Sequence, residues 1–161
     1  MKILKENEET GCCKRFNPAP WKNKEVNFND KLFIHDHVKS LFHIPLNYGK
    51  VMERVMAKIE IAGAKTEDAL MLSDENSLWG SEIYVAVNKD VPGYKTVKIQ
   101  GNYLSKVFEG PFSNMGKWIE EMKKYLADKG KPLKKLYFFY TTCPACAKAY
   151  GKNYTVLLAE V

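Results

Sequence analysis

The sequence predicts an α+β domain made of two strand–helix–strand–strand units with an antiparallel sheet, related by a pseudo-twofold axis around a central cleft. Three observations support this prediction: an internal repeat, two amphipathic helical stretches with matching ends, and a composition typical of one folded domain. The domain is expected over residues 31–161, with unit one at about 31–90 and unit two at about 94–161. Residues 1–30 are expected to form an N-terminal arm.

The repeat consists of segments that match in the same order in both halves of the domain. Residues 41–46 align with residues 107–112, and both read as the end of a strand that runs into a proline turn. Residues 79–85 align with residues 150–156, and both read as strands. Several matching segments in one order are difficult to obtain by chance, so the two halves are predicted to share one topology. The seam between two such units is a natural place for a ligand pocket.

Each half contains one predicted helix between its strands. Both helices begin close to an asparagine and carry one apolar stripe at helical spacing. Gly63 and Gly130 are expected to end the helices at matching positions, because glycine readily adopts the left-handed conformation that closes a helix. The stripes consist of Val51, Val55, Ile59 and Ala62 in the first helix and of Trp118, Met122, Tyr125 and Leu126 in the second.

Composition and charge narrow the class of function. The chain has 161 residues, of which 45% are hydrophobic and 27% charged, as in an ordinary folded domain. Its formal net charge of +6 comes from lysines scattered in pairs, so a nucleic-acid partner is not expected. No apolar run is long enough to span a membrane, and the N-terminus lacks the apolar region of a signal peptide, so a cytoplasmic location is expected. The sequence makes no prediction of the oligomeric state.

The sequence resembles the GyrI-like family of small-molecule-binding domains. The resemblance covers about residues 31–161 and rests on residues 108–115 (Phe-Glu-Gly-Pro-Phe-Ser-Asn-Met), Trp118 and residues 79–85 (Trp-Gly-Ser-Glu-Ile-Tyr-Val). It implies two units around a central cleft that binds apolar, often aromatic and sometimes cationic small molecules. Some stand-alone members resemble hydrolases of reactive cyclopropane-containing toxins. Since no helical period precedes residue 31, a stand-alone protein is expected here and not a transcription activator.

One position departs from the family pattern. Where the resemblance implies an acid two residues before a tyrosine in the second unit, this chain has Phe138, while Tyr140 keeps the tyrosine. Recognition of a cation through that acid is therefore not expected. Glu82, on the matching face of the first unit, could take its place.

Glu82 is the candidate general base. It is flanked by Trp79 and Tyr84 in a predicted strand, where partial desolvation is expected to raise its pKa. Such a carboxylate could activate a water that attacks an electrophilic carbon, while Tyr84 or Tyr140 donates a hydrogen bond or proton at the opposite end. A carboxylate on an exposed strand face without a catalytic role remains the alternative.

Aromatic side chains are the first group of ligand-binding candidates. Trp79, Tyr103 and Trp118, together with Phe138, could contact a flat apolar ligand. For Trp118 the helical stripe favours a place in the core instead.

Charged and titratable side chains form the second group. His43 and Glu109 precede the two proline turns, where both helix N-termini are expected to point into the cleft. His35 and His37 alternate along a predicted strand and so share one face, but the pattern assigns them no chemistry.

The four cysteines allow three interpretations. Cys143 and Cys146 form a Cys-x-x-Cys loop, and Cys12 and Cys13 could complete a structural zinc site with it. The same pair could instead be a redox couple, or all four could be free thiols. Apart from this possible zinc, no cofactor is expected.

The sequence therefore supports one main hypothesis and two alternatives. The main hypothesis is a protein that binds an apolar or aromatic small molecule in the cleft and hydrolyses an electrophilic, cyclopropane-type toxin. The first alternative is a module that sequesters or senses such a ligand without chemistry. The second is a thiol oxidoreductase that uses Cys143 and Cys146.

Overall fold

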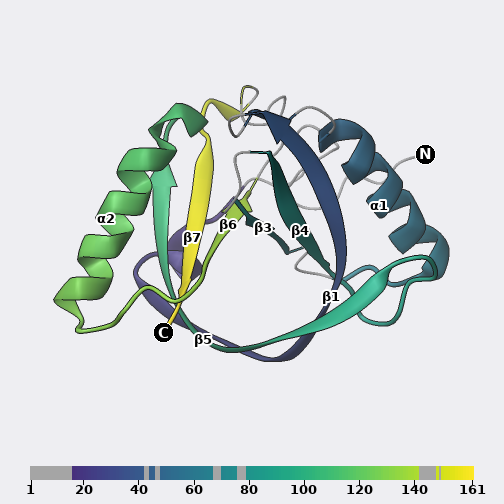
Figure 1. Ribbon diagram of the computed structural model, residues 1–161, viewed down its shortest axis with the longest axis horizontal. Helices are drawn as coiled ribbons and strands as arrows, with labels where there is room; N and C mark the ends of the chain where they lie inside the picture. Colours follow the sequence, from purple (N-terminus) through teal and green to yellow (C-terminus); the bar gives the residue numbers. More distant parts are fainter. Residues whose placement is uncertain are drawn as a thin grey trace. The chain divides into compact units, whose positions relative to one another are not determined.

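The structure is a computed structural model, and it describes residues 16–41, 44–45, 48–66, 70–75, 79–141, 148 and 150–161. The chain divides into two compact units. The middle unit consists of Asn27–Gly101, and the terminal unit consists of Met1–Val26 together with Asn102–Val161. Antiparallel strands and two helices make up the described elements, which confirms the predicted α+β class (Figure 1).

The middle unit is a small antiparallel sheet with one helix. Its elements are β1 (Lys24–Leu41) from Asn27 onward, β2 (Ile44–Pro45), α1 (Tyr48–Ala62), β3 (Met71–Asp74) and β4 (Gly80–Ala86). The strands lie in the order β2-β1-β4-β3. Asp36 of β1 faces α1, because it accepts a hydrogen bond from Arg54 of that helix. The predicted stripe residues Val51, Val55 and Ile59 are buried.

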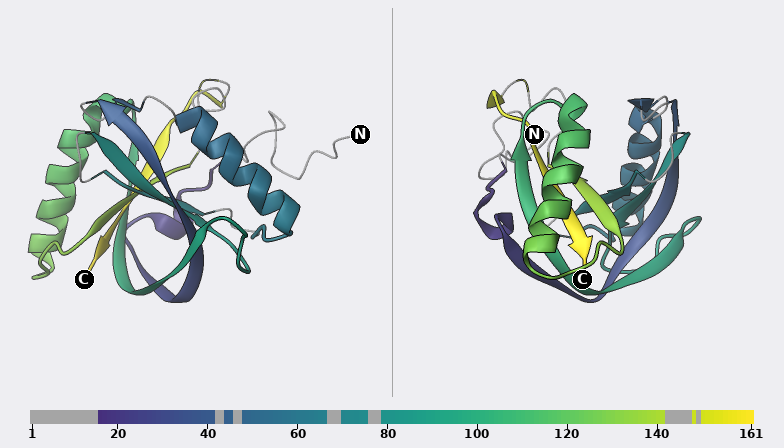
Figure 2. Two further views of the ribbon diagram at one scale, coloured as in Figure 1. Left: turned by 45° about the vertical axis from the view of Figure 1, so that its right-hand side comes forward. Right: turned by 60° about the vertical axis from the view of Figure 1, so that its left-hand side comes forward.

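Apart from the two-residue β2 and the short 3-10 helices, the terminal unit has the same chain order of strand, helix, strand and strand. It contains η1 (Ala19–Trp21), the part of β5 (Lys95–Glu109) that follows Gly101, η2 (Phe112–Asn114), α2 (Met115–Asp128), β6 (Leu136–Tyr140) and β7 (Tyr154–Glu160). Strand β7 lies between β6 and β5. Figure 2 shows α2 lying across the strands of this unit. One face of α2 packs into a core of Leu104, Phe108, Trp118, Met122, Leu126, Phe138, Leu157 and Ala159.

Both helices end as predicted. Gly63 and Gly130 have φ angles of +63° and +68°, in the left-handed region that favours glycine. After each glycine the next backbone N–H bonds back into the helix, from Ala64 to Ile59 over 3.0 Å and from Lys131 to Leu126 over 2.9 Å. The two glycines predicted to end the helices therefore do so.

The boundaries of the units differ from those expected. The division falls at Gly101, inside β5, and not near residues 90–94. The expected N-terminal arm also ends early, because β1 already begins at Lys24 and runs for 18 residues. Strands of this length pass from one unit to the other, which local turn signals do not reveal. The pseudo-twofold relation of the units stays a prediction.

No helix among the described residues is long and apolar enough to cross a membrane.

Candidate functional site

The register of β1 against β4 brings together the titratable residues of the middle unit. His37 lies directly opposite Glu82, and His35 lies directly opposite Tyr84. Directly paired residues of antiparallel strands point to the same face, so these four side chains share the face of the sheet opposite α1. On β3, Asp74 is the register partner of Glu82 on its other side.

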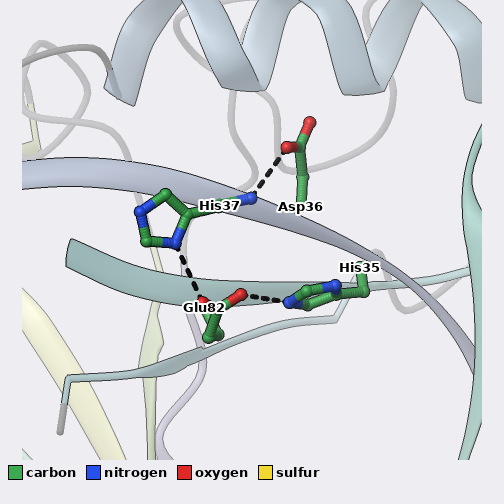
Figure 3. A network of polar contacts seen from close by, with 4 residues as sticks. All are labelled: His35, Asp36, His37 and Glu82. Atoms are coloured by element: carbon green, nitrogen blue, oxygen red, sulfur yellow. Dashed lines mark hydrogen bonds and ion pairs between the residues drawn. The ribbon is translucent and has the colours of Figure 1, made fainter. Parts of the chain in front are cut away.

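Glu82 accepts hydrogen bonds from both histidines (Figure 3). Nδ1 of His37 donates to Oε1 of Glu82 over 2.9 Å, and Nε2 of His35 contacts Oε2. The exposed fractions of the three side chains are 32% for His35, 49% for His37 and 39% for Glu82, so the cluster is accessible to a small molecule. We call these three residues the Glu82 cluster.

The electrostatics of Glu82 run opposite to the expectation from sequence. Burial alone would raise its pKa, but the hydrogen bonds from His37 and His35 and the charge of both rings lower it further than burial raises it. The expected raised pKa is therefore wrong in direction, because the sequence did not show that two imidazoles meet the carboxylate. Glu82 is ionised at neutral pH.

Tyr84 and Trp79 belong to the same unit as Glu82. The ring of Tyr84 lies 5.1 Å from the imidazole of His35. Trp79 precedes β4 and is 60% exposed, and its carbonyl accepts the N–H of Ser40 over 2.9 Å. Of the two candidate tyrosines, Tyr84 thus shares a sheet face with the proposed base.

A hollow of about 390 Å³ lies beside His35 in the middle unit. At one wall Arg54 donates from Nη2 to Asp36 over 2.8 Å and from Nε to the hydroxyl of Tyr94 over 3.3 Å. The hydrogen bond with Asp36 is the main cause that raises the pKa of Arg54. The other lining residues are His35, Lys58, Pro92, Gly93 and Lys95. Three cationic side chains against one carboxylate favour an anionic or polar group at this place.

Three candidate site residues of the terminal unit lie in its hydrophobic core or pack against it. Trp118 is 4% exposed and stacks on Phe108 at 5.7 Å, which favours the core interpretation. Phe138 is also buried, and Tyr140 packs against the same core. All three lie on the side of the sheet that α2 covers.

Two further candidates of this unit have different surroundings. Tyr103 is buried beside Tyr137, with ring centres 6.0 Å apart, and desolvation, followed by the charges of Tyr137 and Glu160, raises its pKa strongly. Its phenol is therefore neutral, and no open stacking surface remains on it. Glu109 is exposed at the end of β5.

Some candidates lie outside the described residues. These are His43 and the four cysteines Cys12, Cys13, Cys143 and Cys146. The zinc site and the redox pair therefore stay predictions. Within the described part of the chain, no group of three or more histidine, cysteine or acidic side chains is arranged to hold a metal ion.

Sequence reasoning missed the role of His35 and His37. It placed them on one face, which is correct, but it gave no reason to pair them with Glu82, 47 and 45 positions away. A useful signal would have been that polar residues alternate on both predicted strands. Two neighbouring strands that each carry titratable residues at every second position can bring them together once the register is known.

Comparison with known proteins places the chain in one protein family. Residues 3–161 match the family described as bacterial hydrolases. No curated protein matches the sequence.

Solved structures with a similar fold include a hydrolase from Listeria innocua. It is 14% identical with a TM-score of 0.61, and the match covers 87% of this chain and 92% of that one. The C-terminal domain of EcmrR is 11% identical with a TM-score of 0.63, covering 87% and 96%. SAV2435 bound to tetraphenylphosphonium is 11% identical with a TM-score of 0.51, covering 86% and 92%. At these identities the likeness concerns the fold, and it fits the fold that the GyrI-like resemblance implies.

Proposed function

Because the chain belongs to the bacterial hydrolase family, we propose that the protein binds an electrophilic small molecule and hydrolyses it, with Glu82 as the base. The observation that carries the proposal is the placement of Glu82, an ionised carboxylate held between two imidazoles on an accessible sheet face. Two N–H donors fix the orientation of a carboxylate, and a fixed base loses little entropy when it takes a proton.

The proposed reaction adds water across a strained carbon–carbon bond. Glu82 takes a proton from a water molecule as the water oxygen bonds to the electrophilic carbon. The ring bond breaks, its electron pair moves into the conjugated acceptor of the substrate, and Tyr84 protonates that end. The proton on Glu82 then returns to the tyrosine oxygen, so that one water is consumed and the protein is regenerated.

His35 and His37 support this chemistry through the carboxylate. Each imidazole contacts one oxygen of the carboxylate, His35 at Oε2 and His37 at Oε1. The histidines thus orient Glu82 and stabilise its charge before the reaction. A lowered pKa also means that Glu82 stays a carboxylate in mildly acidic solution.

The substrate proposed is small, mainly apolar and electrophilic. Its proposed place is the sheet face that carries the Glu82 cluster, where the exposed fractions of His35, His37 and Glu82 leave room for a small molecule. Since Phe138 stands where the family resemblance implies an acid, selection of a cation there is not part of the proposal. The pseudo-twofold arrangement and the ligand cleft expected from it stay predictions.

A second candidate function is sequestration or sensing of a ligand without chemistry. It is favoured by the neighbour SAV2435, whose fold is similar and which holds tetraphenylphosphonium. The same small molecule would then bind near the Glu82 cluster and leave unchanged.

The test is the Glu82→Gln variant with a reactive cyclopropane-containing compound as the probe. Glutamine keeps the shape of the side chain but cannot take the proton, so turnover is expected to fall about a hundredfold or more while binding persists. Glu120→Gln on the exposed face of α2 is the matched control and should keep full turnover. Turnover that survives in Glu82→Gln removes Glu82 as the base. Binding without turnover in the unchanged protein supports the second function.

A further inference from the structure

Gly80 lies under the imidazole of His37. A Cβ atom built on Gly80 would stand 2.4 Å from Cε1 and 2.6 Å from Nε2 of that ring. Real Cβ contacts are never this short, so any side chain at this position would displace the ring. The backbone of Gly80 has no positive φ, so a left-handed conformation does not explain the glycine. The glycine is explained by the space that its missing side chain leaves for the His37 ring.

The imidazole of His37 is thus held from two directions. Its Nδ1 donates to Glu82 two residues further along β4, and its Cε1–Nε2 edge lies against Gly80 of the same strand. The ring leans along β4 diagonally from its register position. A side chain at Gly80 would close the space that lets the ring reach this orientation.

We propose that Gly80 is a positioning residue of the Glu82 cluster: because it has no side chain, the His37 imidazole lies against β4 and its Nδ1 reaches Glu82. This inference rests on the proposed function only for its catalytic consequence, since the contact itself is independent of any substrate. It also separates the two histidines. His37 is held between Gly80 and Glu82, whereas His35 contacts the other oxygen of Glu82 and lies beside the ring of Tyr84.

Two other charged residues share this face with the cluster. Asp74 of β3 pairs with Glu82, and Lys39 of β1 pairs with Gly80. Both keep their charge in the variants proposed below. A change in the titration of Glu82 therefore reports the imidazole and not a change in the surrounding charges.

The experiment measures the pKa of the Glu82 carboxyl carbon by carbon-13 NMR, with the signal assigned by its absence in Glu82→Gln. Three variants are compared with the unchanged protein: Gly80→Ala, His37→Ala and the double variant. Gly80→Ala is expected to raise the pKa of Glu82, because the hydrogen bond from His37 is lost while the burial of the carboxylate remains. His37→Ala should raise it by a similar amount, and the double variant should add nothing further.

The matched control is Gly49→Ala, since a Cβ at Gly49 meets nothing within 4 Å. It should leave the titration of Glu82 unchanged. In Gly80→Ala the added Cβ would also lie 3.1 Å from the carbonyl oxygen of Val38, so a small loss of stability is compatible with the proposal. If Gly80→Ala does not fold, removal of the ring by His37→Ala should restore folding, and failure to do so overturns the proposal.

An unchanged pKa of Glu82 in Gly80→Ala also overturns the proposal. So does a pKa shift in the double variant that equals the sum of the shifts in the two single variants. These outcomes are separate from those of the turnover test. If Glu82→Gln keeps its turnover while Gly80→Ala still shifts the pKa, the catalytic assignment is wrong and the positioning role stands.

Discussion

The middle and terminal units have the same chain order of elements, yet they use the sheet face opposite their helix for different purposes. In the middle unit this face carries the Glu82 cluster, with half-exposed titratable side chains. In the terminal unit it carries Phe139, and the rings of Phe16 and Trp21 pack on it at 6.1 and 5.6 Å. Phe16 and Trp21 thus cover this face of the terminal unit, whereas the corresponding face of the middle unit carries exposed polar groups.

The difference shows how one topology can separate packing from chemistry. An apolar sheet face gains free energy by being covered, whereas carboxylates and imidazoles are costly to bury without partners. Ser105, fully buried on the covered face, is satisfied by the carbonyls of Trp21 at 2.6 Å and Lys24 at 3.2 Å. The comparison predicts that substitutions in the terminal unit change stability, and that those in the middle unit change function.

The largest effect is expected from Trp118→Ala. This side chain lies in the core of the terminal unit at 4% exposure, so its loss should lower the free energy of unfolding by about 3–5 kcal/mol. Chemical denaturation followed by circular dichroism measures the change. The matched variant is Trp79→Ala, 60% exposed in the middle unit, which should change the stability by less than about 0.5 kcal/mol. Equal losses of unfolding free energy in the two variants would contradict the predicted difference between the terminal and middle units.

A smaller effect separates the two candidate tyrosines. Tyr84→Phe should lower turnover of the cyclopropane probe about a hundredfold, because it removes the proton donor on the face of Glu82. Tyr140→Phe should leave turnover unchanged, since Tyr140 packs on the side of α2. Single-turnover kinetics on both variants checks this. The reverse ranking would move the proton donor to the terminal unit.

The smallest effect concerns the cover of the terminal unit. Ser105→Ala leaves the carbonyl of Trp21 without its buried donor and should cost about 1 kcal/mol of unfolding free energy. Ser113→Ala, on the exposed η2, is the control and should stay within about 0.5 kcal/mol of the unchanged protein. Thermal unfolding of both variants, each compared with the unchanged protein, tests the contact. A loss of stability in Ser113→Ala as large as that in Ser105→Ala would mean that the buried hydrogen bond is not its cause.

The sequence by itself determined that the two helices form and where they end. The apolar stripes of α1 and α2 and the closing glycines Gly63 and Gly130 are local signals within a few residues, and short-range sterics decide them. The sequence also placed Glu82 in a strand and His35 and His37 on one face.

Only the tertiary structure decided what those residues meet. The register of β1 on β4 places His37 opposite Glu82, and a slip by one residue would turn the two side chains to opposite faces. The direction of the Glu82 pKa shift and the need for glycine at position 80 follow from that register alone. Contacts between residues 45 and 47 positions apart depend on how the strands pair, which no local pattern specifies.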